Sequence, residues 1–279
     1  MKINILYLAL ILCALNSQAQ TSTFPVNGAT DNRHTIYAFT NAHIQTDPEV
    51  AIENGIMLIQ DGVILEIGTA VKIPQSAIIY DLKGKCIYAS FIDSYTNYGM
   101  PEIKRGEWSP SPQTTSFREG AFGWNEALKP ETDAAKIFTS NIKDAEELRN
   151  IGFGTVQSFN KDGIARGTSV CVTLNAEDGD NAVMVKDKAT ACFSLDKGSS
   201  KQDYPSSTMG AIALLRQTSY DAEWYRNEKD KKEFNITLEA WNGNLSLPQI
   251  FETTDKWNVV QADKLGDEFK VQYIFKGSG

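Results

Sequence analysis

The sequence predicts an α/β fold in which a small all-β unit precedes a larger part built of alternating strands and helices. Residues 35–90 contain short β-rich runs separated by turn signals such as Asp47-Pro48 and Asp61-Gly62. From residue 134 onward, helical spacing of apolar residues alternates with short apolar runs. Apolar strands that alternate with helices are typical of a parallel sheet or barrel covered on both faces.

The strands expected in the β unit are short and closely spaced. They cover residues 35–44, parts of the run 52–68, residues 77–82 and residues 85–90. We expect hairpin turns at Asn54-Gly55 and Asp61-Gly62, because these dipeptides readily adopt the positive φ that tight hairpins require.

The larger part begins with an expected long loop over residues 100–135, because its Pro-rich segment 109–116 cannot form a helix interior. Helical spacing then predicts one helix over residues 134–152, with Gly152 as its stop signal. The remaining expected elements are strands over 153–159, 168–174, 182–186, 189–195, 248–253 and 271–276, and helices over 209–227, 238–243 and 259–269.

The first nineteen residues have the features of a secretory signal peptide. Lys2 precedes an apolar stretch from Ile3 to Leu15, and small residues follow up to Ala19. A membrane anchor is the alternative, but the apolar stretch is shorter than the roughly 18–20 residues that a span requires. We expect cleavage after Ala19 and a periplasmic or secreted mature protein.

Charge and cysteine content narrow the classes of partner and site. Loss of residues 1–19 removes one lysine and no acid, which takes the net charge from −8 to −9. Such a chain repels phosphate backbones, so we expect no nucleic-acid partner, and no later segment is apolar enough to span a membrane.

The mature chain keeps Cys86, Cys171 and Cys192, whose spacing excludes CxxC metal knuckles. Buried free thiols and a Cys171–Cys192 disulfide are the two alternatives.

Motifs of one enzyme superfamily occur in order along the first half of the chain. They are NAHI (41–44), GIMLIQDGVILEIG (55–68), YDLKGK (80–85) and FID (91–93), followed later by LRNIGFGTVQ (148–157). On these motifs the sequence resembles the amidohydrolase superfamily, and within it the imidazolonepropionase-like branch, over most of residues 35–160.

The resemblance implies a particular domain organisation. Residues 20–90 would form the N-terminal part of a composite β-sandwich, and residues 91–279 the N-terminal part of a (β/α) TIM-like barrel with inserted loops and strands. A complete barrel takes roughly 250 residues, so the barrel is expected to be incomplete. The expected partner is then the missing C-terminal part of the same polypeptide, with self-association in its absence.

The resemblance also implies a metal centre whose ligands are altered in this chain. The family binds zinc or another divalent metal through an H-x-H pair at the end of the first barrel strand, where Tyr95 and Asn97 stand here. Ligands from later strands would fall near Glu252 or Thr254 and at Lys276. Neutral tyrosine and asparagine are poor zinc ligands, so we expect this site to be degenerate.

The histidine content leads to the same expectation. The whole chain has two histidines, His34 and His43, and both lie in the β unit. A histidine-based metal centre cannot be assembled from them, and we expect this chain to hold no metal or other cofactor.

Two hypotheses of function follow from these observations. By resemblance, the chain is the N-terminal fragment of an exported hydrolase that acts on non-peptide carbon–nitrogen bonds and has lost its H-x-H metal site in this fragment. The alternative is a non-catalytic binding or scaffolding module built on an amidohydrolase frame, because the β unit is retained while the ligands are absent.

Overall fold

The computed structural model describes residues 34–105, 115–175, 183–228 and 233–277. The chain divides into two compact units, Met1–Ala89 and Ser90–Gly279. The expected signal peptide, residues 1–19, lies outside the described residues. Within the described ranges, none of the helices combines the length and the apolar character needed to cross a membrane.

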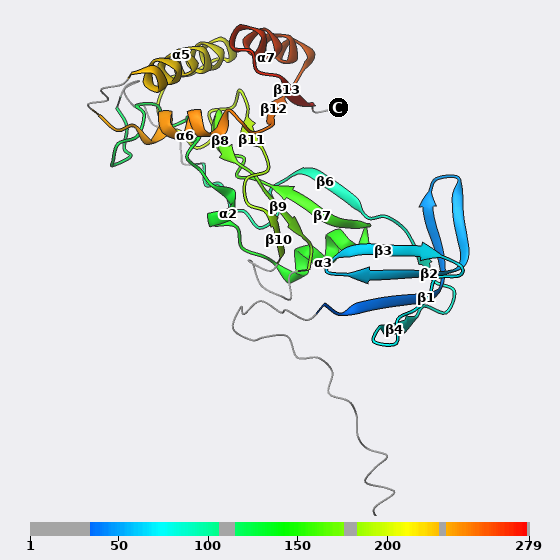
Figure 1. Cartoon of the computed structure of the whole chain (residues 1–279). Coiled ribbons are helices and arrows are strands. Elements are labelled where there is room, and N and C mark those ends of the chain that lie inside the picture. Colours follow the sequence, from blue (N-terminus) through cyan, green and yellow to red (C-terminus); the bar gives the residue numbers. More distant parts are fainter. Residues whose placement is uncertain (1–33, 106–114, 176–182, 229–232, 278–279) are drawn as a thin grey trace, which may run out of the picture. The chain divides into compact units, whose positions relative to one another are not determined.

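The N-terminal unit is a five-stranded sheet in which β1 is central (Figure 1). Its strands are β1 (Ile36–Asp47), β2 (Val50–Gln60), β3 (Val63–Gly68), β4 (Ile78–Asp81) and β5 (Cys86–Ile87). Strand β1 pairs antiparallel with β2 and parallel with β4 and β5, and β3 pairs antiparallel with β2. The described residues of this unit form one sheet, and the second layer of the expected β-sandwich is not present among them.

The two expected hairpin turns of this unit have different outcomes. Asp61 and Gly62 both have positive φ, at 52° and 76°, and form the tight turn between β2 and β3, as predicted. The turn expected at Asn54-Gly55 is wrong, because β2 runs through it. Asn54, with φ 50°, instead lies at a bulge where the register between β1 and β2 shifts. The pairing of β1 with β2 continues on both sides of Asn54-Gly55, and it therefore outweighs the preference of this dipeptide for a turn.

The C-terminal unit contains two four-stranded sheets (Figure 1). The first has the order β10-β9-β7-β6 and consists of β6 (Phe91–Thr96), β7 (Phe153–Ser158), β9 (Val170–Thr173) and β10 (Met184–Lys186). The second has the order β13-β12-β11-β8 and consists of β8 (Ala165–Thr168), β11 (Ala191–Phe193), β12 (Gln249–Thr253) and β13 (Tyr273–Gly277). Neither sheet closes into a barrel within the described residues.

The expected parallel pairing is present in both sheets. Strand β6 pairs parallel with β7, and β12 pairs parallel with both β11 and β13. Strands β8 and β9 follow each other directly in the chain but belong to different sheets, and each pairs antiparallel with its neighbour. The segment 165–173 therefore connects the two sheets.

The helix expected over residues 134–152 is wrong as a single element. The structure has two helices, α2 (Ala134–Ile137) and α3 (Ile142–Asn150). Phe138 leaves helical geometry and packs against the ring of Tyr98, with ring centroids 5.7 Å apart. The side chain of Asn141 then caps α3 by accepting hydrogen bonds from two backbone amides. Burial of Phe138 in the core decides this break, which local spacing does not reveal.

The main hydrophobic core lies between the second sheet and three further helices. These are α5 (Thr208–Asn227), α6 (Ile236–Asn244) and α7 (Lys256–Phe269). The largest side chains of this core include Phe193 and Phe251 from the sheet and Leu215, Trp241 and Leu265 from the helices.

The long loop that precedes α2 is well packed where the structure describes it. Fully buried Asn125 donates to the carbonyl of Tyr204, and Gln202 donates to the carbonyls of Thr115 and Trp124. Backbone hydrogen bonds also join loop residues 127–132 to the segment 164–168. This loop therefore holds β8 and the residues around it in place.

The alternative of a disulfide between Cys171 and Cys192 is wrong. All three cysteines of the mature chain have free thiols, with Cys192 buried, Cys171 half-buried and Cys86 exposed. Burial raises the pKa of Cys192 to about 12, which keeps its thiol protonated.

Candidate functional site

Polar and charged side chains gather at the carboxyl ends of three strands in the C-terminal unit. Tyr95, Glu252 and Lys276 are the next-to-last residues of β6, β12 and β13. Glu252 and Lys276 are also register partners in the parallel pair β12–β13. Two further cations, Lys161 and Arg166, come from the segment around β8. We call these five residues the cationic cluster.

Arg166 is the centre of this cluster. Its side chain is only 4% exposed. The Nη1 atom donates to Glu252 Oε2 over 2.5 Å and to the Tyr95 hydroxyl over 3.0 Å, and Nε donates to the carbonyl of Gly163 over 3.1 Å. The guanidinium group therefore joins two strand ends and fixes both side chains.

The ion pair controls the charge of Glu252. Burial alone would raise the pKa of this carboxyl, but the hydrogen bond and positive charge of Arg166 outweigh burial and lower the pKa. Glu252 is therefore ionised at neutral pH.

Tyr95 remains neutral at the same pH. Burial raises the pKa of its hydroxyl far above the ordinary value, although the charge of Arg166 acts in the opposite direction. Its ring packs edge-on against Phe159, with centroids 4.6 Å apart. Tyr95 thus provides an aromatic face and a polar tip, without a negative charge.

Two lysines lie over the Tyr95 ring. The Nζ atoms of Lys161 and Lys276 are 4.7 Å and 5.2 Å from its centroid. Burial lowers the pKa of Lys161, and the charges of Arg166 and Lys276 add to this effect, while Glu252 and Asp93 oppose it. In the described part of the chain, neither lysine makes an ion pair.

The fold that contains this cluster is similar to that of known proteins. No protein-family model matches the chain, and a search of curated proteins found no match. Among solved structures, an amidohydrolase from Thermotoga maritima MSB8 matches with a TM-score of 0.65 and 20% sequence identity, over 86% of this chain and 63% of that chain. The chain has an amidohydrolase-like fold. It spans 63% of the length of the Thermotoga structure.

Two further solved structures are more distant. An amidohydrolase matches with 15% identity and a TM-score of 0.36, and a prolidase complexed with N-methylphosphonate-L-proline matches with 11% identity and a TM-score of 0.38. Each match covers 83% of this chain and 59% of the other chain. These TM-scores are too low to support a structural conclusion.

The cationic cluster does not fit the divalent metal that an amidohydrolase-like fold implies. Its donors are one carboxylate, which already pairs with Arg166, and one neutral tyrosine hydroxyl. Arg166 contacts both oxygens and two lysines lie over the tyrosine ring, so three positive side chains would repel a metal cation. Among the residues that the structure describes, no group of three His, Cys, Asp or Glu side chains could hold a metal ion.

The structure brings together three of the four positions at which the resemblance implied metal ligands. Tyr95, Glu252 and Lys276 belong to the cationic cluster. Asn97 does not, because β6 ends at Thr96 and the alternation of a strand does not extend to the next residue. The histidines pair instead within the N-terminal unit, His34 with Asp61 and His43 with Glu53.

Sequence reasoning missed Lys161 and Arg166. Both lie in the run KDGIARGT (161–168), where an arginine occurs among small and apolar residues. A charged side chain in such a run signals a buried, paired charge. Its partner, Glu252, is 86 residues away in the chain, so the sequence alone does not identify it.

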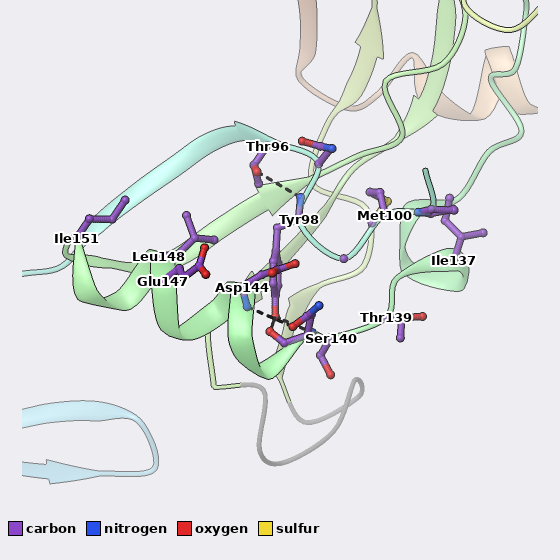
Figure 2. A pocket seen from close by; sticks show the side chains of 14 residues that line it. Thr96, Tyr98, Met100, Ile137, Thr139, Ser140, Asp144, Glu147, Leu148 and Ile151 are labelled. Carbon is purple, nitrogen blue, oxygen red and sulfur yellow. Dashed lines mark hydrogen bonds between the residues drawn. The ribbon is translucent and has the colours of Figure 1, made fainter. Parts of the chain in front are cut away.

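Asn97 lies instead in a hollow of about 820 Å³ next to the end of β6 (Figure 2). Loop residues that follow β6, the segment between α2 and α3, and one side of α3 line this hollow. Its lining combines apolar Met100, Ile137, Leu148 and Ile151 with acidic Asp144 and Glu147. Tyr98 packs at its base, where the hydroxyl donates to the carbonyl of Asn141 over 3.2 Å. The hollow shares no lining residue with the cationic cluster.

Proposed function

We propose that this protein is an exported binding module on an amidohydrolase frame, in which the cationic cluster stands where the family holds its metal. The observation that carries this proposal is that Arg166, Lys161 and Lys276 gather at Tyr95 in a cluster whose own side chains include one carboxylate, that of Glu252, and Arg166 already pairs with it. Guanidinium and ammonium groups bind and orient anionic groups, and they do not generate the metal-activated water on which the family depends.

Metal analysis of the purified full chain tests this proposal. After incubation with zinc and dialysis, we expect well under one equivalent of zinc per chain by mass spectrometry, and no hydrolysis of cyclic amides. Repulsion by the three cations is the physical reason. One equivalent of tightly held zinc together with hydrolysis would show that the binding-module proposal is wrong.

A second candidate is a hydrolase of the imidazolonepropionase-like branch that acts on non-peptide carbon–nitrogen bonds. The observation that favours it is that the chain spans only 63% of the Thermotoga amidohydrolase. In this case a C-terminal part of the same polypeptide completes the TIM-like barrel and the β-sandwich and supplies the metal ligands. The coding sequence after Gly279 decides: an open frame with a second D-x-H-x-H strand supports this candidate, and an immediate stop codon contradicts it.

Export to the periplasm or the medium is part of the proposal in both cases. The charged start, apolar stretch and small residues of segment 1–19 support it. Protein sequencing of the mature form should begin at Gln20, and an intact Met1 on the cell-associated protein would argue against export.

A further inference from the structure

The charges of the cationic cluster are not balanced by its own side chains. Arg166 pairs with Glu252, and the carboxylate of Asp93 accepts a hydrogen bond from the backbone amide of Tyr95 over 2.9 Å. Lys161 and Lys276 remain without an ion-pair partner among the described residues, and both Nζ atoms lie within 5.2 Å of the centroid of the same ring. The cluster therefore has an excess of positive charge around the ring of Tyr95.

This arrangement is unfavourable for the protonated form of Lys161. Burial and the neighbouring cations lower the pKa of Lys161, which means that its protonated form is less favourable here than in water. Lys161 also lies beside the ring of Phe159, with Nζ 5.8 Å from the centroid. An anion in contact with both ammonium groups would reduce their repulsion and accept charge-assisted hydrogen bonds from them.

The same features separate these lysines from ordinary surface lysines. Lys264 on α7, for example, is exposed. Within the part of the chain that the structure describes, it makes no cation–π contact. Lys161 and Lys276 are half-buried and lie over one ring at the carboxyl ends of parallel strands, where folds of this type place their ligands.

We propose that Lys161 and Lys276 bind a small oxyanion, a carboxylate or phosphate group of a ligand, over the ring of Tyr95. This inference rests on the proposed binding function and names its ligand class. In this site Arg166 is a positioning residue: it holds Tyr95 and Glu252, while the two lysines contact the ligand.

Binding of two probes to the full chain tests the inference. Calorimetric titrations at neutral pH and low salt use inorganic phosphate in one series and malonate in the other. We expect at least one probe to bind, and the tighter one identifies the oxyanion. Lys161→Met and Lys276→Met replace the lysine with an unbranched side chain that has no charge. Each should weaken binding about tenfold through loss of a charge-assisted hydrogen bond.

Matched variants make the result specific. Lys264→Met makes the same change in net charge outside the cluster, and its affinity should stay within about twofold of the original protein. Lys161→Arg and Lys276→Arg keep the charge and should keep most of the affinity. These variants still test the site if a methionine variant fails to fold. Absence of binding by both probes, or an equal loss in Lys264→Met, would overturn the inference.

The metal analysis described above separates the two proposals. A metal-free chain that binds neither probe refutes the oxyanion inference alone and leaves the binding-module proposal in place. A chain that holds zinc and hydrolyses cyclic amides refutes the binding-module proposal, whatever the result with phosphate or malonate.

Discussion

Residues 20–279 expressed alone are expected to associate and to unfold without a single sharp transition. Strands β6 and β13 are the outer strands of their sheets in the described structure, and each pairs on one side only. Phe91 and Ile92 on β6 and Ile274 on β13 are each more than half exposed. Outer strands with apolar side chains readily pair with other chains.

The expected size of this effect follows from the exposed apolar surface. If the outer strands leave about 400 Å² of apolar surface in water, the cost is about 10 kcal/mol at roughly 25 cal/mol per Å². This cost is comparable with the whole stability of a typical domain, roughly 5–15 kcal/mol. The N-terminal sheet has a similar feature, because Val63, Ile64 and Leu65 on its outer strand β3 are all exposed.

Light scattering after size exclusion and calorimetry measure association and unfolding. Ile92→Lys and Ile274→Lys should reduce association, because a lysine on an outer strand disfavours pairing with another chain. Ile142→Lys is the matched control, since Ile142 is also exposed but lies on α3 rather than on a strand. A monomer that melts in one sharp two-state transition would contradict the prediction.

Glu252→Gln is expected to lower the free energy of unfolding by about 2 kcal/mol at neutral pH. The change keeps the size of the side chain but removes a carboxylate. Within the described residues, this carboxylate is the only ion-pair partner of Arg166. The guanidinium group would then remain buried beside two other cations. The Glu252 side chain is 28% exposed, so water screens part of this loss and the value lies below that of a fully buried pair. Urea denaturation measures the change.

The pH dependence of this loss provides a second measurement. The pKa of Glu252 is lowered from 4.5 in the folded protein, so its stabilising contribution is fully present above that pH. The contribution is lost as pH falls through 4.5 and then through the folded pKa. The difference between the original protein and Glu252→Gln should therefore shrink as pH falls below 4.5.

Glu268→Gln is the matched control for this variant. Glu268 pairs with Arg216 between α7 and α5, with the Nε atom 2.8 Å from Oε2, but the Arg216 side chain is 43% exposed. Water can replace the lost partner at this exposed pair, so a much smaller loss of stability is expected. Equal losses in the two variants would mean that the Arg166–Glu252 pair has no special role.

The sequence by itself determined most of the elements of this protein. Alternation and helical spacing are local properties, and they predicted most of the strands, the C-terminal helices and the presence of parallel pairing, but not strand β8. The turn at Asp61-Gly62 followed from the positive φ that its residues tolerate. The presence of only two histidines, both in the N-terminal unit, also led to the expectation that this chain holds no histidine-based metal centre.

Tertiary structure decided the exceptions and the contents of the site. Burial of Phe138 against Tyr98 broke a helix that local spacing predicted as continuous, and long pairing of β1 with β2 turned Asn54-Gly55 into a bulge. The cationic cluster joins residues that are far apart in the chain, for example 86 positions in its Arg166–Glu252 pair. Strand pairing brings such residues together. Charge neutralisation depends on distance in space, so no local pattern in the chain could identify Glu252 as the partner of Arg166.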